Sequence, residues 1–88
     1  MALLDLLGRR WALRVLYELG HGPLGFRELQ ERCDSMSTSV LSQRLGELRE
    51  AGIVEPADSG GYALTAEGER LLGPLGDLDR WAKRWAYR

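Results

Sequence analysis

Apolar residues recur every three or four positions over the first part of the chain, which is the spacing of one helix face. A short patch before Gly8 consists of Leu3, Leu4 and Leu7. The next stretch places five apolar residues on one face: Trp11, Ala12, Val15, Leu16 and Leu19. Glycine and proline in residues 20–23 then break the pattern. We expect a helical region over about 2–19, followed by a turn.

Two further helices are predicted between residues 25 and 51. Gly25 opens the first, whose inward positions are Phe26, Leu29 and Cys33. Ser37 is a favourable N-cap for the second, in which an apolar stripe is formed by Leu41, Leu45 and Leu48. Gly52 ends this helix. Because only residues 34–36 separate the two helices, the pattern predicts a helix-turn-helix over about 25–51.

Short extended segments follow at residues 53–55 and 62–64, joined by the turn-rich residues 56–61. This predicts a β-hairpin over about 53–64. Leu24, before the second helix, can pair briefly as an extended residue. Thr65 can cap a last helix over about 65–87, which carries a broad apolar side: Leu71, Leu72, Leu75, Leu78, Trp81 and Trp85. Pro74 is expected to kink or interrupt this helix near its start.

The order of these elements predicts the fold class. It is mainly α with a small β-hairpin, the arrangement of a winged helix-turn-helix DNA-binding domain. Residues 1–88 are expected to form one such domain, because 88 residues suit one core and not two. The terminal helices, about 2–19 and 65–87, serve the core and dimerisation, and the hairpin at about 53–64 is the wing.

The helix that follows Ser37 carries the candidate chemistry. With Leu41 set inward, a helical period places small polar groups, a glycine and a glutamate on the opposite side: Ser39, Ser42, Gln43, Gly46 and Glu50. Hydroxyl and amide groups can donate and accept hydrogen bonds at base edges in the major groove. The residues predicted to face that groove are Ser37, Thr38, Ser39, Ser42 and Gln43. Those predicted to hold phosphates, which position a helix without reading sequence, are Arg27, Arg44 and Arg49.

Taken alone, serine, threonine and glutamine on an exposed helix face are mostly just solvated. The preceding helix and the following hairpin favour the DNA interpretation. The net charge of −1 is unusual for a nucleic-acid binding module, and the predicted hairpin loop, residues 56–61, carries no Lys or Arg, only Asp58. A winged-helix protein-interaction module without DNA binding therefore stays open as an alternative.

Composition excludes several other classes. A hydrophobic content of 44% with 28% charged residues is typical of an ordinary soluble globular protein. The chain shows no apolar run near the roughly 20 residues that a membrane crossing needs, and its start does not resemble a signal peptide. With a single cysteine we expect a cytoplasmic location, no internal disulfide, no cofactor and no metal site. Because nothing resembles a catalytic motif, we expect no enzyme, and His21 is interpreted as a turn residue.

Four ordered motifs resemble the HxlR-type family of transcriptional regulators. The first two motifs are GRRWALRVL at residues 8–16 and GPLGFREL at residues 22–29. The third consists of Met36-Ser37 followed by LSQRLGEL at residues 41–48, and the fourth is YALTAEG at residues 62–68. The resemblance runs from about Leu6 to Trp85 and implies a winged-helix DNA-binding homodimer that regulates transcription. Many relatives carry a sensing cysteine before the first helix, and this chain has none there. Cys33 is instead predicted to be a buried core thiol.

The resemblance implies that terminal helices meet across a two-fold axis, so that two recognition helices lie about one DNA turn apart on a pseudo-palindromic duplex. Large apolar residues at both ends of so small a chain are hard to bury within one subunit. The residues predicted to dimerise are Leu3, Leu4, Leu7, Trp81 and Trp85. A third hypothesis is a ligand-gated regulator, with an effector of unknown identity at the dimer seam.

Overall fold

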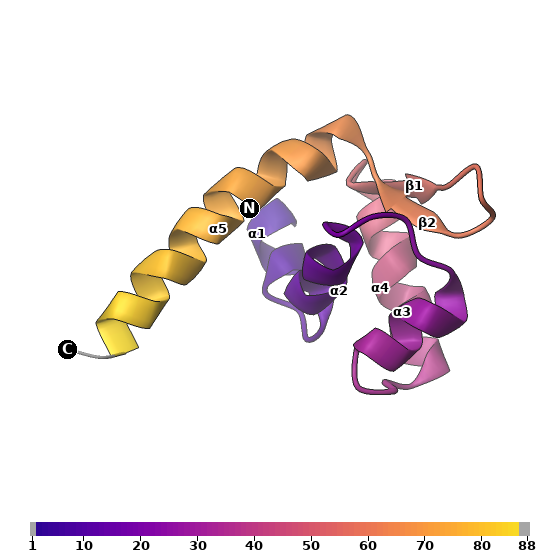
Figure 1. The fold of residues 1–88 in the computed structure, drawn as a ribbon, viewed down its shortest axis with the longest axis horizontal. Coiled ribbons are helices and arrows are strands. Elements are labelled where there is room, and N and C mark those ends of the chain that lie inside the picture. The colour runs from indigo at the N-terminus through magenta and orange to yellow at the C-terminus, as the bar shows by residue number, and fades with distance from the viewer. Residues whose placement is uncertain (1, 87–88) are drawn as a thin grey trace.

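The computed structural model describes residues 2–86 (Figure 1). Five helices and one hairpin follow each other in the order α1 Ala2–Leu7, α2 Ala12–Leu19, α3 Phe26–Arg32, α4 Thr38–Glu50, β1 Val54–Pro56, β2 Tyr62–Leu64 and α5 Ala66–Ala86. This is the predicted winged helix-turn-helix order. The predicted domain included residues 1, 87 and 88, and the predicted last helix ended at residue 87; these three residues lie outside the described part of the chain.

The N-terminal region divides into two helices because the backbone turns between Gly8 and Trp11. Trp11 occupies the left-handed region with φ of 76°, which an α-helix cannot include, and α2 begins at the next residue. The sequence pattern predicted a helical region over about 2–19 and did not show this division into two helices. Side-chain periodicity continues through the turn and does not report its backbone geometry.

The helix-turn-helix forms as predicted. The side chain of Ser37 accepts a hydrogen bond from the backbone N–H of Val40 at 3.2 Å, so it caps α4. Asp34 and Ser35, in the turn before it, both adopt positive φ, 58° and 55°. The backbone N–H of Ser35 is bonded to the carbonyl of Gln30 at 2.9 Å, which fixes the turn against the end of α3.

The hairpin is antiparallel, with Val54 opposite Leu64 and Pro56 opposite Tyr62. Leu24 forms an isolated antiparallel bridge to Tyr62, with N–O distances of 3.0 and 2.8 Å, which confirms the predicted pairing. A Cβ atom at Gly61 would lie 2.3 Å from the carbonyl oxygen of Leu24, so only glycine permits this close approach. The wing is therefore bonded to the segment that connects α2 and α3.

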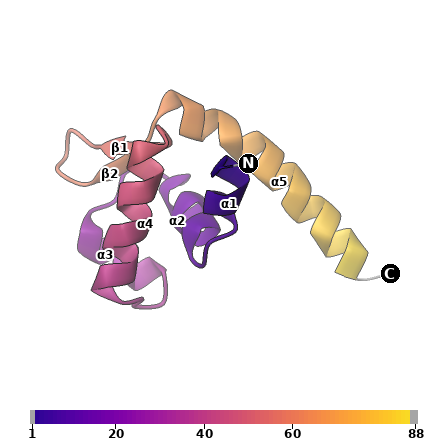
Figure 2. The same cartoon turned by 180° about the vertical axis from the view of Figure 1, so that it is seen from behind.

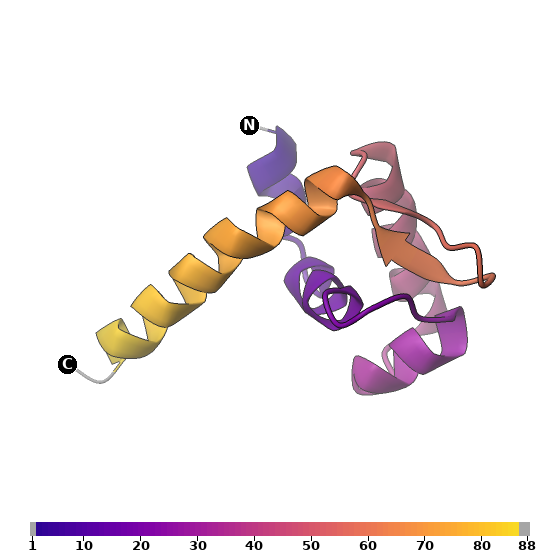
Figure 3. The same ribbon diagram turned by 45° about the horizontal axis from the view of Figure 1, so that its top comes forward.

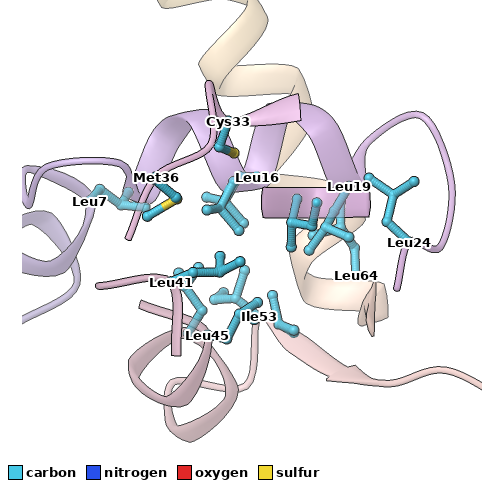
Figure 4. Close-up of a cluster of buried hydrophobic side chains, with 14 residues drawn as sticks. Leu7, Leu16, Leu19, Leu24, Cys33, Met36, Leu41, Leu45, Ile53 and Leu64 are labelled. Carbon is cyan, nitrogen blue, oxygen red and sulfur yellow. The ribbon is translucent and has the colours of Figure 1, made fainter. Parts of the chain in front are cut away.

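The core lies between α2, α3, α4 and the base of the hairpin (Figure 4). All three leucines of the α4 stripe are buried, and Cys33 is fully buried as predicted. Leu7 also belongs to this core, with 8% of its surface exposed. The prediction that Leu7 contributes to a dimer surface is thus corrected: α1 turns this side chain inward and leaves Leu3 and Leu4 outside.

The C-terminal half of helix α5 extends away from the rest of the molecule (Figures 1 and 3). Thr65 caps it through a hydrogen bond from the N–H of Gly68 at 3.1 Å. The expected interruption at Pro74 is wrong, since α5 is continuous from Ala66 to Ala86. Pro74 and Arg70 are exposed, so water can reach the carbonyl that proline leaves without an amide partner. Within residues 2–86, no helix combines the length and apolar character that a membrane crossing requires.

Candidate nucleic-acid interface

Helix α4 has two chemically different faces. Leu41, Leu45 and Leu48 are buried, with 0%, 3% and 0% of their surfaces exposed. The opposite side presents exposed residues: Thr38, Ser39, Ser42, Gln43, Gly46, Arg49 and Glu50. The leucines therefore attach the helix to the core and leave its polar face outward. Figure 2 shows α4 from this outer side.

The predicted groove-facing residues differ in how far the protein itself already uses them. The Ser37 hydroxyl is occupied in capping α4. Thr38 accepts a hydrogen bond from Nε2 of Gln30 at 3.2 Å, and the Ser39 hydroxyl lies 3.5 Å from that of Ser37. The side chains of Ser42 and Gln43 make no hydrogen bond to any described residue. These two are the most available for an external partner.

Arg44 is not available in the way the sequence suggested. Its Nε donates to the carbonyl oxygen of Arg10 at 2.8 Å and its Nη1 pairs with Glu47, and only 11% of its side chain is exposed. The prediction that Arg44 holds a phosphate is corrected, because the side chain bridges α4 to the α1–α2 connection. Arg27 and Arg49 are exposed, and neither pairs with a carboxylate among residues 2–86.

Acidic groups collect at the C-terminal end of α4. Glu50 is exposed there, Glu47 lies one turn earlier, and Glu55 follows on β1. The carbonyl end of the helix dipole adds negative potential at the same place. The N-terminal half of α4, with Ser42 and Gln43, is therefore the part suited to approach a polyanion.

Sequence reasoning missed a polar cluster that supports the helix-turn-helix. Arg14 and Glu18 are charged residues four positions apart and lie outside the apolar face predicted for this helix, yet only 8% of Glu18 is exposed. Arg14 donates to the Glu18 carboxylate at 2.9 Å and to the backbone carbonyl of Arg32 at 2.6 Å. It also lies 3.5 Å from the Asp34 carboxylate. The hydrogen bond to Glu18 raises the pKa of Arg14, and the cluster ties α2 to the turn that precedes α4. The spacing of four between Arg14 and Glu18 was the available signal.

Burial raises the pKa of the Cys33 thiol, which keeps it protonated and poorly reactive. No group of three or more His, Cys, Asp or Glu in residues 2–86 is arranged to hold a metal ion.

A second exposed surface is apolar. Leu3, Leu4, Trp81 and Trp85 are 42–56% exposed, and the two tryptophan rings stack with centroids 6.3 Å apart. Three further large apolar residues, which the dimerisation prediction did not include, are also exposed: Leu13, Tyr17 and Leu78. A groove of about 670 Å³ runs between α2 and α5 and is lined in part by Leu13, Tyr17, His21, Leu72, Leu78 and Lys83.

Comparison with known proteins assigns the family. The HxlR-like helix-turn-helix family matches residues 6–88. The uncharacterized HTH-type transcriptional regulator YvaP of Bacillus subtilis is 33% identical over 92% of this chain and 81% of its own length.

Solved structures agree. Quinone-bound YodB from B. subtilis superposes with a TM-score of 0.86 at 32% identity, covering 94% of this chain and 92% of YodB. A possible HxlR family transcriptional factor from Thermoplasma volcanium gives a TM-score of 0.82 at 26% identity, covering 97% of this chain and 82% of that protein. These relatives are transcriptional regulators and not enzymes, as the sequence predicted. The chain belongs to the HxlR-like helix-turn-helix family and is a transcriptional regulator of the winged-helix type.

Proposed function

We propose that this regulator binds a pseudo-palindromic DNA duplex as a homodimer, with the N-terminal half of α4 in the major groove. The observation that carries the proposal is the exposed and uncommitted pair Ser42 and Gln43, held by buried leucines and flanked by exposed arginines. A duplex offers base-edge donors and acceptors to such groups and phosphates to such cations.

In this proposal, Gln43 and Ser42 read base edges, and Ser39 stands one turn before Gln43 on the same face. A glutamine amide can pair bidentately with adenine N6 and N7. Ser37 and Thr38 start the helix and take part mainly by holding its first turn, where free backbone N–H groups favour an anion. Gly46 faces open space, since a Cβ built there would meet nothing within 4 Å. Because glycine has no side chain, the helix can approach the DNA closely at this position.

Arg27 and Arg49 hold phosphates on either side of the groove. Arg27 stands in the first turn of α3, where a cation opposes the helix dipole. A phosphate partner compensates for that position. Two phosphates in each subunit give four in a dimer, and a log–log salt slope of about −3.6.

The apolar surface of α1 and α5 forms the dimer seam. Leu3, Leu4, Trp81 and Trp85 are all about half exposed in one subunit, and burying large apolar groups stabilises association. A two-fold axis at this seam would set two copies of α4 about one helical turn of DNA apart, roughly 34 Å.

The deciding experiment is selection of binding sites from a random duplex library, followed by titration of the selected duplex at two salt concentrations. We expect an inverted repeat and a salt-dependent affinity. If no duplex is enriched and the protein shows no salt-dependent binding to DNA, the proposal fails and the protein-interaction module is favoured instead.

A second candidate function is relief of DNA binding by a small molecule, favoured by the groove between α2 and α5. Its lining is largely apolar, with Asp79 and Lys83 at one side. An apolar ligand there would contact both the core helix α2 and the proposed dimer helix. Screening apolar ligands by thermal shift, in wild type and in Leu13→Glu, tests it: ligand-induced shifts should vanish in the variant, and shifts of equal size would place the ligand elsewhere.

A further inference from the structure

The basic residues of the described chain fall into two groups. Those within ion-pair distance of a carboxylate are Arg9, Arg14, Arg32, Arg44, Arg70, Arg80 and Lys83. Those in residues 2–86 with no such partner are Arg10, Arg27, Arg49 and Arg84. Arg27 and Arg49 flank the candidate interface, and Arg84 lies near the far end of α5. Arg10 had no role in the sequence interpretation.

Arg10 lies beside the recognition helix although it is more than thirty positions away in sequence. Its carbonyl oxygen accepts the hydrogen bond from Nε of Arg44, at 2.8 Å, and Arg44 directly follows Gln43. The neighbouring Arg9 lies 3.5 Å from Glu47, so a second contact joins the same two segments. Figure 2 shows the α1–α2 connection next to α4. The backbone of Arg10 is thereby fastened to the flank of the helix.

The Arg10 side chain remains available for a ligand. The residue is exposed, and its guanidinium carbon lies 5.7 Å from the centroid of the Trp11 ring. Stacking on an aromatic face orients a guanidinium and leaves its N–H groups, at the edge of the plane, free to donate. A planar fork of this kind matches the oxygens of a phosphate.

We propose that Arg10 is a third phosphate-binding residue of each subunit and that Arg44 positions it. This inference rests on the proposed DNA binding. It assigns different tasks to two arginines: Arg44 joins the α1–α2 connection to α4, and Arg10 uses that attachment to reach the DNA backbone. With three phosphates in each subunit, the log–log salt slope of the dimer becomes about −5.4 instead of about −3.6, since each phosphate contributes about 0.9.

The test compares Arg10→Ala with wild type on the selected duplex and on a random duplex. Loss of two phosphates per dimer should reduce the steepness of the salt slope by about 2, because each phosphate contributes about 0.9. Affinity near physiological salt should fall about tenfold on both duplexes alike, since phosphates carry no sequence information. Arg70→Ala is the matched control: it removes the same charge from an exposed arginine on α5 and should leave the slope unchanged.

Two further variants separate phosphate binding from a structural role. Arg10→Lys keeps the charge and should retain the wild-type slope. Arg10→Gln keeps a shorter polar side chain without charge and should behave as Arg10→Ala, even if thermal unfolding of the alanine variant is altered. An unchanged slope in both Arg10→Ala and Arg10→Gln overturns the inference while leaving DNA binding intact. Absence of any duplex binding by the wild-type protein overturns both.

Discussion

Helices α4 and α5 are both amphipathic, and they use their apolar sides in opposite ways. The leucines of α4 are covered by the rest of the subunit, each at most 3% exposed. On α5, Leu78, Trp81 and Trp85 are 57%, 53% and 52% exposed. Helix α4 thus contributes its hydrophobic surface to the core and presents its polar surface outside, whereas the C-terminal half of α5, beyond Leu75, exposes its large apolar residues.

The difference indicates which kind of partner each helix can receive. A polar surface on a helix that is anchored to the core loses little conformational entropy when it binds a hydrated ligand. It discriminates between ligands through hydrogen bonds. An exposed surface with two large aromatic groups gains most from a second apolar surface. In the proposed complex, DNA would therefore contact α4 and a protein partner would contact α5.

The largest expected effect comes from the buried side of α4. Leu48→Ala should lower the free energy of unfolding by about 3 kcal/mol, because it removes a fully buried side chain and leaves a cavity. Urea unfolding measures this loss. Leu78→Ala is the matched change on α5 and should lower intrinsic stability by less than about 1 kcal/mol. Similar losses in both variants would mean that the two helices do not differ as described.

The next effect concerns the exposed side of α5. Trp81→Ala should weaken self-association by about 2 kcal/mol, or roughly thirtyfold, if this ring is buried between subunits. Sedimentation over a concentration series measures the change. Arg80→Ala, next to it in sequence and 70% exposed, is the control and should leave the association constant nearly unchanged. Equal association of wild type and Trp81→Ala would remove α5 from the seam.

A smaller effect is expected on the polar side of α4. Gln43→Ala should reduce discrimination between the selected duplex and single-base variants by about 1–2 kcal/mol at one base pair. The contrasting variant is Gln30→Ala. Gln30 donates to the carbonyl of Met36 at 2.8 Å, inside the turn. That variant should lower stability and leave base preference in place. Equal losses on all duplexes for Gln43→Ala would contradict base readout.

The smallest expected effect is the pH dependence of the free energy of unfolding that comes from the buried Cys33 thiol. Burial raises the pKa of Cys33 above that of the unfolded chain, about 8.5, so the unfolded state loses its thiol proton first. The contribution of the buried, protonated thiol to the free energy of unfolding is fully present below about pH 8.5. It is lost as the pH rises above that value, by at most about 1.4 kcal/mol per pH unit. Urea unfolding between roughly pH 7.5 and 10 measures it. Cys33→Ala should flatten the decline, and an equally steep decline would assign it to other groups.

Much of the fold followed from local patterns. The stripe of leucines, the cap at Ser37 and the turn residues before β2 each report their own structure, because the spacing and chemistry act over a few positions. The availability of a side chain is different, since it depends on segments far away in sequence. Arg44 looked free on a helical wheel, and only the approach of Arg10 revealed its engagement.

The same reasoning explains the other corrections. Leu7 and Leu4 are equally apolar, and the turn at Trp11 decides which one reaches the core. Glu18 sits where its helix alone would place it in water, and the loop after α3 covers it. Periodicity identifies a helix and its faces, but it does not tell which neighbouring segment covers a face.

The contact between Gly61 and Leu24 determines which positions of the hairpin can accept substitutions or insertions. Replacing Gly61 by any larger residue would force the hairpin off the α2–α3 connection, since a Cβ would lie 2.3 Å from the Leu24 carbonyl oxygen. The tip at Asp58 and Ser59 is exposed and has no such restriction. A longer tip, or one with added lysines, would therefore give the hairpin a segment able to contact the minor groove, and the rest of the fold would stay unchanged.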